Sequence, residues 1–290
     1  MAKLEDFKNK IEVQWCPGCP NFGILQALKL ALAALDKTPQ ELCLVSGIGQ
    51  AAKLPHYLKC NFFNGLHGRA LPAALGIHVA NPGLTTIVTT GEGDCYGEGG
   101  NHFLHTLRRN PDLTVVVHNN QFYALTKGQG SPTTPKGEKR NLQFQGVESE
   151  PLNMPAIAIL HNCTFVARGF AGDIEHLKSI LMEAITHRGL AYVEVLQPCI
   201  TWGKRPLTWY KDRVYELGAD FDPTDRTAAL AKAEEVGEKT PIGILYHTVP
   251  RETFAHRFRR QVTDRPLAEL KPLPPEKLTQ FMDRFIPRTD

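Results

Sequence analysis

Segments whose apolar residues recur at helical spacing alternate along the chain with short, almost entirely apolar segments. Residues 21–35 are the clearest helical case, because Ile24, Leu28 and Leu32 fall on one face. Helical patterns also cover residues 69–80, 101–109, 154–161 and 174–187. Short runs rich in β-branched and apolar residues indicate buried strands at residues 41–49, 85–90, 113–118 and 191–196.

Strands separated by helices predict an α/β fold, a mainly parallel sheet with helices on both faces. A polar loop spans residues 119–150. After Cys199 the pattern changes to aromatic, arginine and proline residues, with a helix expected near 225–237, a strand near 241–246 and an extended end at 266–275. We therefore expect an α/β domain over residues 1–199 and a C-terminal extension over 200–290 that packs on the core or on a partner chain.

Composition narrows the class of protein further. The 290 residues carry a net charge of +3, which is too small to indicate nucleic acid binding. No apolar run approaches the length of a membrane span, and the charged N-terminus does not resemble a secretory signal. We expect a cytoplasmic protein without a membrane partner, in which the seven cysteines are unlinked and serve packing or metal binding.

A glycine-rich segment, Gly91-Glu92-Gly93-Asp94, follows the strand expected at residues 85–90. Glycines at the carboxyl end of a parallel strand let a phosphate approach the backbone. Carboxylates beside a diphosphate are reasonable if Mg²⁺ lies between them. The next strand ends at Asn119-Asn120, which places a second polar cluster at the same sheet edge. A nucleotide-binding glycine loop or a plain tight turn is the competing interpretation of the glycines alone.

The spacing of these two clusters resembles the thiamine diphosphate motif, Gly-Asp-Gly followed about 28 residues later by Asn-Asn. That resemblance implies that Glu92, the Asn120 side chain and the Phe122 carbonyl hold Mg²⁺. Glu92 stands where the motif has aspartate, and its extra methylene requires the metal or the backbone to shift. Asp94 is the alternative ligand.

The segment Trp15-Cys16-Pro17-Gly18-Cys19 precedes the first helix and admits two interpretations. A Cys-x-x-Cys pair at a helix start is typical of a thioredoxin-like redox site, where the dipole lowers the thiol pKa. It is also half of an iron–sulfur site. A chain of this length with a separate metal–diphosphate motif is not a thioredoxin module, which favours the cluster.

Signature segments along most of the chain resemble the β subunits of 2-oxoacid:ferredoxin oxidoreductases. The tail around Trp209-Tyr210 is similar to the subfamily acting on 2-oxoglutarate and broader 2-oxoacids. The resemblance implies a thiamine-diphosphate-binding fold. It is carried by residues 15–22 (WCPGCPNF), 46–49 (SGIG), 65–70 (GLHGRA), 99–102 (GGNH), 108–110 (RRN), 125–133 (LTKGQGSPT) and 197–199 (QPC).

The same resemblance implies one [4Fe–4S] cluster near the thiamine ring. Cys16, Cys19 and Cys199 match three of its four cysteine ligands, but Gln50 occupies the position of the fourth. Glutamine is a poor cluster ligand, so another thiol substitutes, or the cluster is altered or absent. We expect Cys60 as the substitute. Cys43 comes second, because a strand cysteine more often belongs to the core; Cys95 and Cys163 are assigned to packing.

Further site residues are implied by the resemblance. Lys53 matches a lysine that faces the carboxylate of the substrate, although alone it would be interpreted as a surface lysine. His67 is expected to contact the cofactor; otherwise Gly68 makes a tight turn and Arg69 pairs with a carboxylate. The remaining cofactor contacts expected are Gly47, Ile48, Gly49, Gly68, Gly91, Gly93, Leu125 and Thr126.

The activity implied is coenzyme A-dependent oxidative decarboxylation of a 2-oxoacid to an acyl-CoA, with electrons passing through the cluster to ferredoxin, or the reverse. 2-Oxoglutarate is the expected substrate and pyruvate the next. An α subunit is expected to supply the glutamate that thiamine needs, in a dimer of αβ pairs. The alternatives are a non-redox thiamine decarboxylase subunit, a thiol–disulfide oxidoreductase and a non-catalytic partner-binding subunit.

Overall fold

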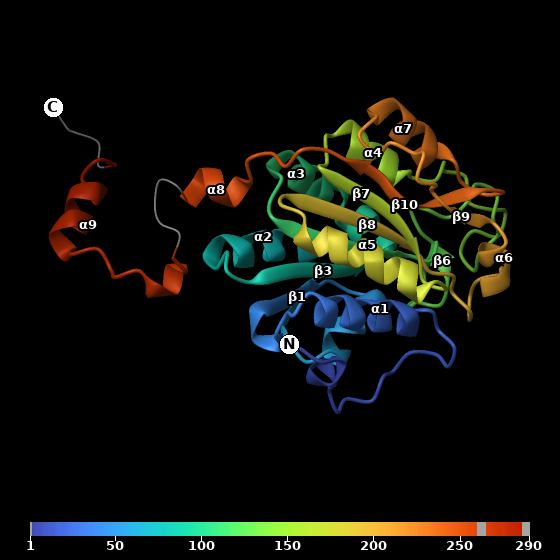
Figure 1. Cartoon of the computed structure of the whole chain (residues 1–290), viewed down its shortest axis with the longest axis horizontal. Coiled ribbons are helices and arrows are strands. Elements are labelled where there is room, and N and C mark those ends of the chain that lie inside the picture. The colour runs from blue at the N-terminus through green and yellow to red at the C-terminus, as the bar shows by residue number, and fades with distance from the viewer. Residues whose placement is uncertain (1, 260–264, 286–290) are drawn as a thin grey trace.

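The computed structural model describes residues 2–259 and 265–285, and its centre is an eight-stranded sheet (Figure 1). The strand order is β2-β1-β3-β4-β8-β7-β10-β9, and every pairing is parallel except that of β10 with β7. The predicted α/β fold is confirmed. The strands are β1 (Leu42–Ser46), β2 (Asn61–Asn64), β3 (Thr85–Gly91), β4 (Leu113–Asn119), β7 (Phe165–Phe170), β8 (Leu190–Leu196), β9 (Val214–Glu216) and β10 (Thr240–His247).

The helices expected from periodicity are present within one or two residues of their expected ends. They are α1 (Asn21–Ala34), α2 (Ala70–Ala80), α3 (Gly100–Arg109), α4 (Met154–Leu160) and α5 (Ile174–Thr186). The later helices are α6 (Leu207–Lys211), α7 (Arg226–Glu234), α8 (Phe254–Arg259) and α9 (Pro275–Met282). None of the helices within the described ranges is long and apolar enough to cross a membrane.

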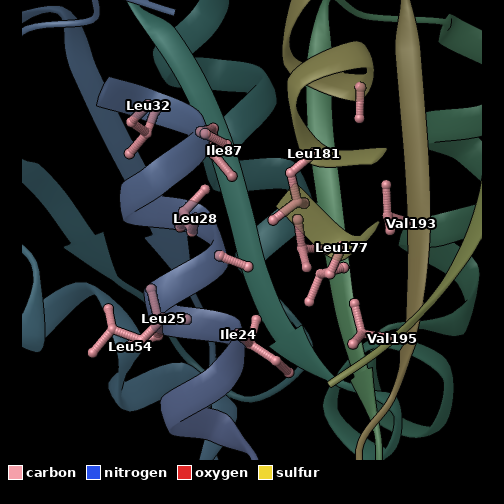
Figure 2. Close-up of a cluster of buried hydrophobic side chains, with 14 of the residues drawn as sticks. Ile24, Leu25, Leu28, Leu32, Leu54, Ile87, Leu177, Leu181, Val193 and Val195 are labelled. Carbon is pink, nitrogen blue, oxygen red and sulfur yellow. The ribbon is translucent and has the colours of Figure 1, made fainter. Parts of the chain in front are cut away.

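Helices cover both faces of the sheet because neighbouring residues of each central strand point to opposite sides. On one face α1 and α5 pack over Ile87, Val193 and Val195, as Figure 2 shows. On the other face α2, α3, α4 and α7 pack over the alternate strand residues, among them Val88 and Tyr192. The two buried clusters sandwich the sheet and fix its strands in register.

Two parts of the sheet differ from the expectation. The short, exposed β2 and the strand β7, with its buried Arg168, lack a clean apolar run and were not predicted. The chain after Cys199 also returns to the sheet: the strand expected near 241–246 is present as β10 and pairs with β7, and the unpredicted β9 pairs with β10. Beyond β10 the chain leaves the sheet. The segment predicted to be extended, residues 266–275, contains a short 3-10 helix, Leu267–Glu269, and α9 begins at its last residue. The helix α9 lies away from the sheet with exposed side chains (Figure 1).

Candidate active site

The glycine segment after β3 and the asparagine pair ending β4 lie at one edge of the sheet, as predicted. β3 and β4 are parallel neighbours, and Gly91 is in register with His118. Glu92 therefore follows one strand where Asn119 and Asn120 end the next. A tight helical turn, Gly93–Glu98, leads from Glu92 directly into α3.

Glu92 is a buried carboxylate with only 1% of its surface exposed. Burial raises the pKa of Glu92 to about 7, and hydrogen bonds from the Ser131 hydroxyl and the Asn120 and Gly93 backbone offset part of that shift. Its Oε1 atom has no hydrogen-bond partner. A buried carboxylate with an unpartnered oxygen is costly in a protein unless a cation meets it. The longer side chain at this motif position is thus compatible with a metal.

Asp94 has its own set of protein partners. Its carboxylate accepts hydrogen bonds from the backbone of Gly68 at 2.7 Å and Ile48 at 3.1 Å, and from the Thr90 hydroxyl at 2.6 Å. His67 Nδ1 lies 2.6 Å from Asp94 Oδ1. These bonds join the loop after β1 to the loop before α2, so the Asp94 carboxylate has a structural role. Glu92 is therefore the better candidate for binding Mg²⁺.

Gly68 is required by the close approach of these loops. Its φ is +70°, and a Cβ at this position would collide with Glu98 and come within 2.6 Å of Gly99 N. Gly47 is constrained in the same way, because a Cβ there would overlap the Asp94 carboxylate. The tight turn expected at Gly68 is present, but Arg69 donates to the Glu98 carbonyl at 2.9 Å and not to a carboxylate.

The segment after Asn120 folds back over the site. The Asn120 Oδ1 atom accepts from Phe122 N at 2.9 Å, and β5 (Phe122–Tyr123) pairs with β6 (Gln129–Gly130). Leu125 and Thr126 are exposed in the turn between these strands. Sequence reasoning named neither Ser131, which donates to Glu92, nor Tyr123, whose ring packs on Gly93. Their positions depend on how the loop closes.

A buried network behind the edge positions Asn119. Its Nδ2 donates to Glu194 Oε1 at 2.9 Å, and Arg168 Nε donates to Glu194 Oε2 at 3.0 Å. Thr133 donates its hydroxyl to Asn119 Oδ1 at 2.8 Å. Arg168 and Glu194 are both buried, and each neutralises the charge of the other, which would destabilise the fold if it were buried alone. This network was not predicted, since it joins three strands and a loop.

Three cysteines meet in a cavity beside this edge. Cys16, Cys19 and Cys199 line it together with Asn120, Gln50 and Gln197. Burial raises the pKa of the Cys19 thiol to about 11, and Cys199 and Cys16 contribute to the same shift because they lie close by. The Thr201 hydroxyl lies 3.2 Å from Cys16 Sγ, and Trp202 N donates to Cys199 Sγ at 3.4 Å. The distant segments expected to meet therefore do so.

The structure does not bring the expected fourth cysteine into this cavity. Cys60 immediately precedes β2 and lies beside Cys43, with its Sγ donating to the Leu58 carbonyl at 3.7 Å. Gln50, not a thiol, lines the cavity with the other three. Cys95 and Cys163 are buried in the core, which confirms their assignment to packing.

Among residues 2–259 and 265–285, no group of three or more His, Cys, Asp or Glu side chains is arranged to hold one metal ion. Thiolates that bind an iron–sulfur cluster attach to different irons and therefore stand further apart than the ligands of one zinc.

Lys53 is half-buried on the short helix Ala51–Tyr57 that comes after Gln50.

The mainly parallel sheet, with Glu92 and Asn120 at the edge where β3 and β4 end, is the architecture of a thiamine pyrophosphate-binding α/β protein. The family model "Thiamine pyrophosphate enzyme, C-terminal TPP binding domain" matches residues 46–195. A second model, for the C-terminal part of the pyruvate ferredoxin oxidoreductase beta subunit, matches residues 199–261. The two matches are consecutive and together run from the end of β1 to beyond α8.

The chain belongs to the family of 2-oxoacid:ferredoxin oxidoreductase β subunits. It is 45% identical to one from Saccharolobus solfataricus, over 84% of this chain and 85% of that protein. It is 41% identical to the beta subunit of 2-oxoacid:ferredoxin oxidoreductase 1 from Aeropyrum pernix, over 89% and 85%. A solved structure of 2-oxoglutarate:ferredoxin oxidoreductase from Magnetococcus marinus, with 2-oxoglutarate, coenzyme A and succinyl-CoA bound, superimposes with a TM-score of 0.88 at 32% identity, over 96% of this chain and 95% of that one.

Proposed function

We propose that this chain is the cofactor-binding β subunit of a 2-oxoacid:ferredoxin oxidoreductase that acts on 2-oxoglutarate. The reaction is oxidative decarboxylation to an acyl-CoA, or its reversal. The observation that carries the proposal is that Asn120 lies at the sheet edge where β3 and β4 end, beside Glu92, and also lines the cysteine cavity. A cofactor at the edge and an electron acceptor in the cavity would therefore be neighbours.

Glu92, the Asn120 side chain and the Phe122 carbonyl would hold Mg²⁺, which would offset the negative charge of the diphosphate group of thiamine pyrophosphate. Thiamine, when bound, supplies an electron sink for the carbon that loses CO₂. Gly91 would leave the backbone accessible to the diphosphate, since a Cβ there would meet no other atom nearer than 3.9 Å, whereas the Tyr123 ring packs on Gly93. Asp94 holds together the loops that carry Ile48 and His67.

Lys53 would place a positive charge near the substrate carboxylate. Cys16, Cys19 and Cys199 would hold the cluster that accepts electrons one at a time and passes them to ferredoxin. An α subunit would complete the site, and the exposed apolar residues of β2 and the C-terminal segment are candidate contacts with it or with a second αβ pair.

The experiment is a viologen-reduction assay on the αβ complex with 2-oxoglutarate, pyruvate and no 2-oxoacid. We expect reduction that requires thiamine pyrophosphate, Mg²⁺ and coenzyme A, with a higher kcat/KM for 2-oxoglutarate. A higher kcat/KM for pyruvate would reassign the substrate. Release of CO₂ without acceptor reduction would replace the oxidoreductase by a non-redox decarboxylase.

A further inference from the structure

The cysteine cavity contains two buried amide oxygens that no protein group satisfies. Gln50 Oε1 and Gln197 Oε1 both lack a hydrogen-bond partner, and Gln197 is only 2% exposed. Both side chains line the cavity with Cys16, Cys19 and Cys199. An unpartnered buried carbonyl oxygen is destabilising, so two of them beside three thiols indicate a ligand.

The two glutamines differ in what their amide groups already contact. Gln197 Nε2 lies 3.7 Å from Cys19 Sγ and 3.4 Å from the Pro198 carbonyl, so this amide is placed to donate a hydrogen bond to a thiolate. Gln50 comes from the loop after β1, an element that contributes no thiol to the cavity. It therefore brings an amide oxygen to the cavity from a different element than those that carry the three cysteines.

The backbone of Gln50 is tied directly to the segment that carries two of the cysteines. Trp15 Nε1 donates to the Gln50 carbonyl at 2.9 Å. Trp15 is buried, with edge-on contacts to Phe22 and Tyr57. This contact links the loop after β1 to the Cys16–Cys19 turn, and it therefore holds the Gln50 backbone beside the thiols.

We propose that Gln50 Oε1 is the fourth ligand of the iron–sulfur cluster, which thus has three thiolates and one neutral oxygen. The inference rests on the proposed function, since that function calls for the cluster. Cys60 is excluded from this role as long as the structure around β2 is kept, because its thiol faces Leu58 and Cys43. Gln197 Nε2 is placed to donate a hydrogen bond to the Cys19 thiolate.

An amide oxygen binds iron more weakly than a thiolate and carries no charge, which has two consequences for the cluster. The iron beside Gln50 is the labile one, so that ferricyanide, a one-electron oxidant, converts [4Fe–4S]²⁺ to [3Fe–4S]⁺ with release of Fe²⁺ and transfer of one electron to the oxidant. The cluster also has a higher reduction potential than one with four thiolates, since its reduced form carries less negative charge.

The test compares αβ complexes carrying wild-type chain, Gln50→Cys, Gln50→Ala and Cys60→Ser, purified and reconstituted without oxygen. Iron and sulfide are counted per β chain before and after ferricyanide, and EPR spectra are recorded. In the wild type and in Cys60→Ser, we expect about four irons to fall to about three, with the EPR signal of an oxidised three-iron cluster. Gln50→Cys should keep its fourth iron and have a lower potential, and Gln50→Ala should hold about three irons from the start.

Three results would overturn the proposal. One is loss of the cluster in Cys60→Ser while Gln50→Ala keeps four irons through oxidation. Another is a wild-type fourth iron that resists ferricyanide as firmly as that of Gln50→Cys, and the third is a wild type without iron after reconstitution. Thiamine-dependent CO₂ release from 2-oxoglutarate, measured on the same samples, separates these failures from failure of the proposed function, because it does not require the fourth iron.

Discussion

Glu92 has the features of a metal ligand whose burial, in the absence of the metal, lowers the free energy of unfolding. Its carboxylate is buried, its pKa is raised to about 7, and one oxygen has no partner. Without a cation the charged form is penalised by burial, while the protonated form is not. The folded chain therefore binds this proton more tightly than the unfolded chain, whose glutamate has an ordinary pKa near 4.5.

Glu92→Gln removes that penalty and should change the pH dependence of stability. The penalty is absent below about pH 4.5, grows as the pH rises and is complete above about pH 7, because the raised pKa is that of an acid. Relative to wild type, the free energy of unfolding of the variant should increase by about 2–3 kcal/mol between pH 5 and pH 8. Urea denaturation of the metal-free, cofactor-free chain measures this.

Glu98→Gln is the matched control, since Glu98 is exposed and lies in the same turn. Its free energy of unfolding should differ from wild type by less than about 0.5 kcal/mol at both pH values. Equal pH dependence of Glu92→Gln and wild type would contradict a buried, cation-free carboxylate at Glu92.

The same titration should govern cofactor binding. Protons and Mg²⁺ compete for Glu92, so the affinity for Mg²⁺–thiamine pyrophosphate should decrease by about tenfold for each pH unit below about 7 and level off above it. Calorimetric titrations from pH 5.5 to pH 8.5 follow the effect. In Glu92→Gln the affinity should be at least about a hundredfold lower at pH 8 and lose this slope; an unchanged slope would assign the proton to another group.

At the scale of elements, helices and central strands could be predicted because their apolar residues repeat with one period. α1 and β3 are each predicted to within one residue. β7 could not be predicted, because the charge of Arg168 interrupts its apolar pattern. Burial of that charge depends on its ion pair with Glu194 on β8. β2 is short and exposed, so its strand conformation depends on pairing with β1.

Two glycines near α2 give a matched pair of substitutions with opposite signs. Gly68→Ala should lower the free energy of unfolding by at least about 2 kcal/mol, because its positive φ disfavours a side chain and its Cβ would collide with Glu98 and Gly99. Gly76→Ala should raise it by about 1 kcal/mol, since Gly76 lies within α2 with open space around it. Urea denaturation of both variants checks the signs. An unchanged free energy of unfolding in Gly68→Ala would show that the loop carrying Gly68 is not in close contact with Glu98 and Gly99.

The buried ion pair between β7 and β8 should be needed for folding stability. Arg168→Ala leaves the Glu194 carboxylate buried without its cation, which should cost about 3–5 kcal/mol and disturb Asn119 at the site. Arg188→Ala, at an exposed position, should change the free energy of unfolding by less than about 0.5 kcal/mol. Equal melting temperatures of the two variants would refute a structural role for the pair.

For the whole molecule, sequence motifs indicated which segments meet, but not which side chains finish the site. The meeting of the Gly91–Asp94 segment with Asn119 and Asn120 at one sheet edge could be predicted because two adjacent parallel strands end there. The structural role of Asp94 and the contribution of Ser131 could not, since both depend on loops that cross from other elements. Cys60 was expected from its residue type, and the pairing of β2 with β1 places it elsewhere.

We propose that thiamine chemistry at the β3–β4 edge delivers electrons into the adjacent cysteine cavity. The most direct measurement is rapid-freeze EPR after mixing the αβ complex with 2-oxoglutarate and coenzyme A, with no external acceptor. We predict that the iron–sulfur signal changes within one turnover in the wild type and does not change in Glu92→Gln. Release of CO₂ from 2-oxoglutarate with no change in the iron–sulfur signal would contradict the account, because the cavity would then take no part in the reaction.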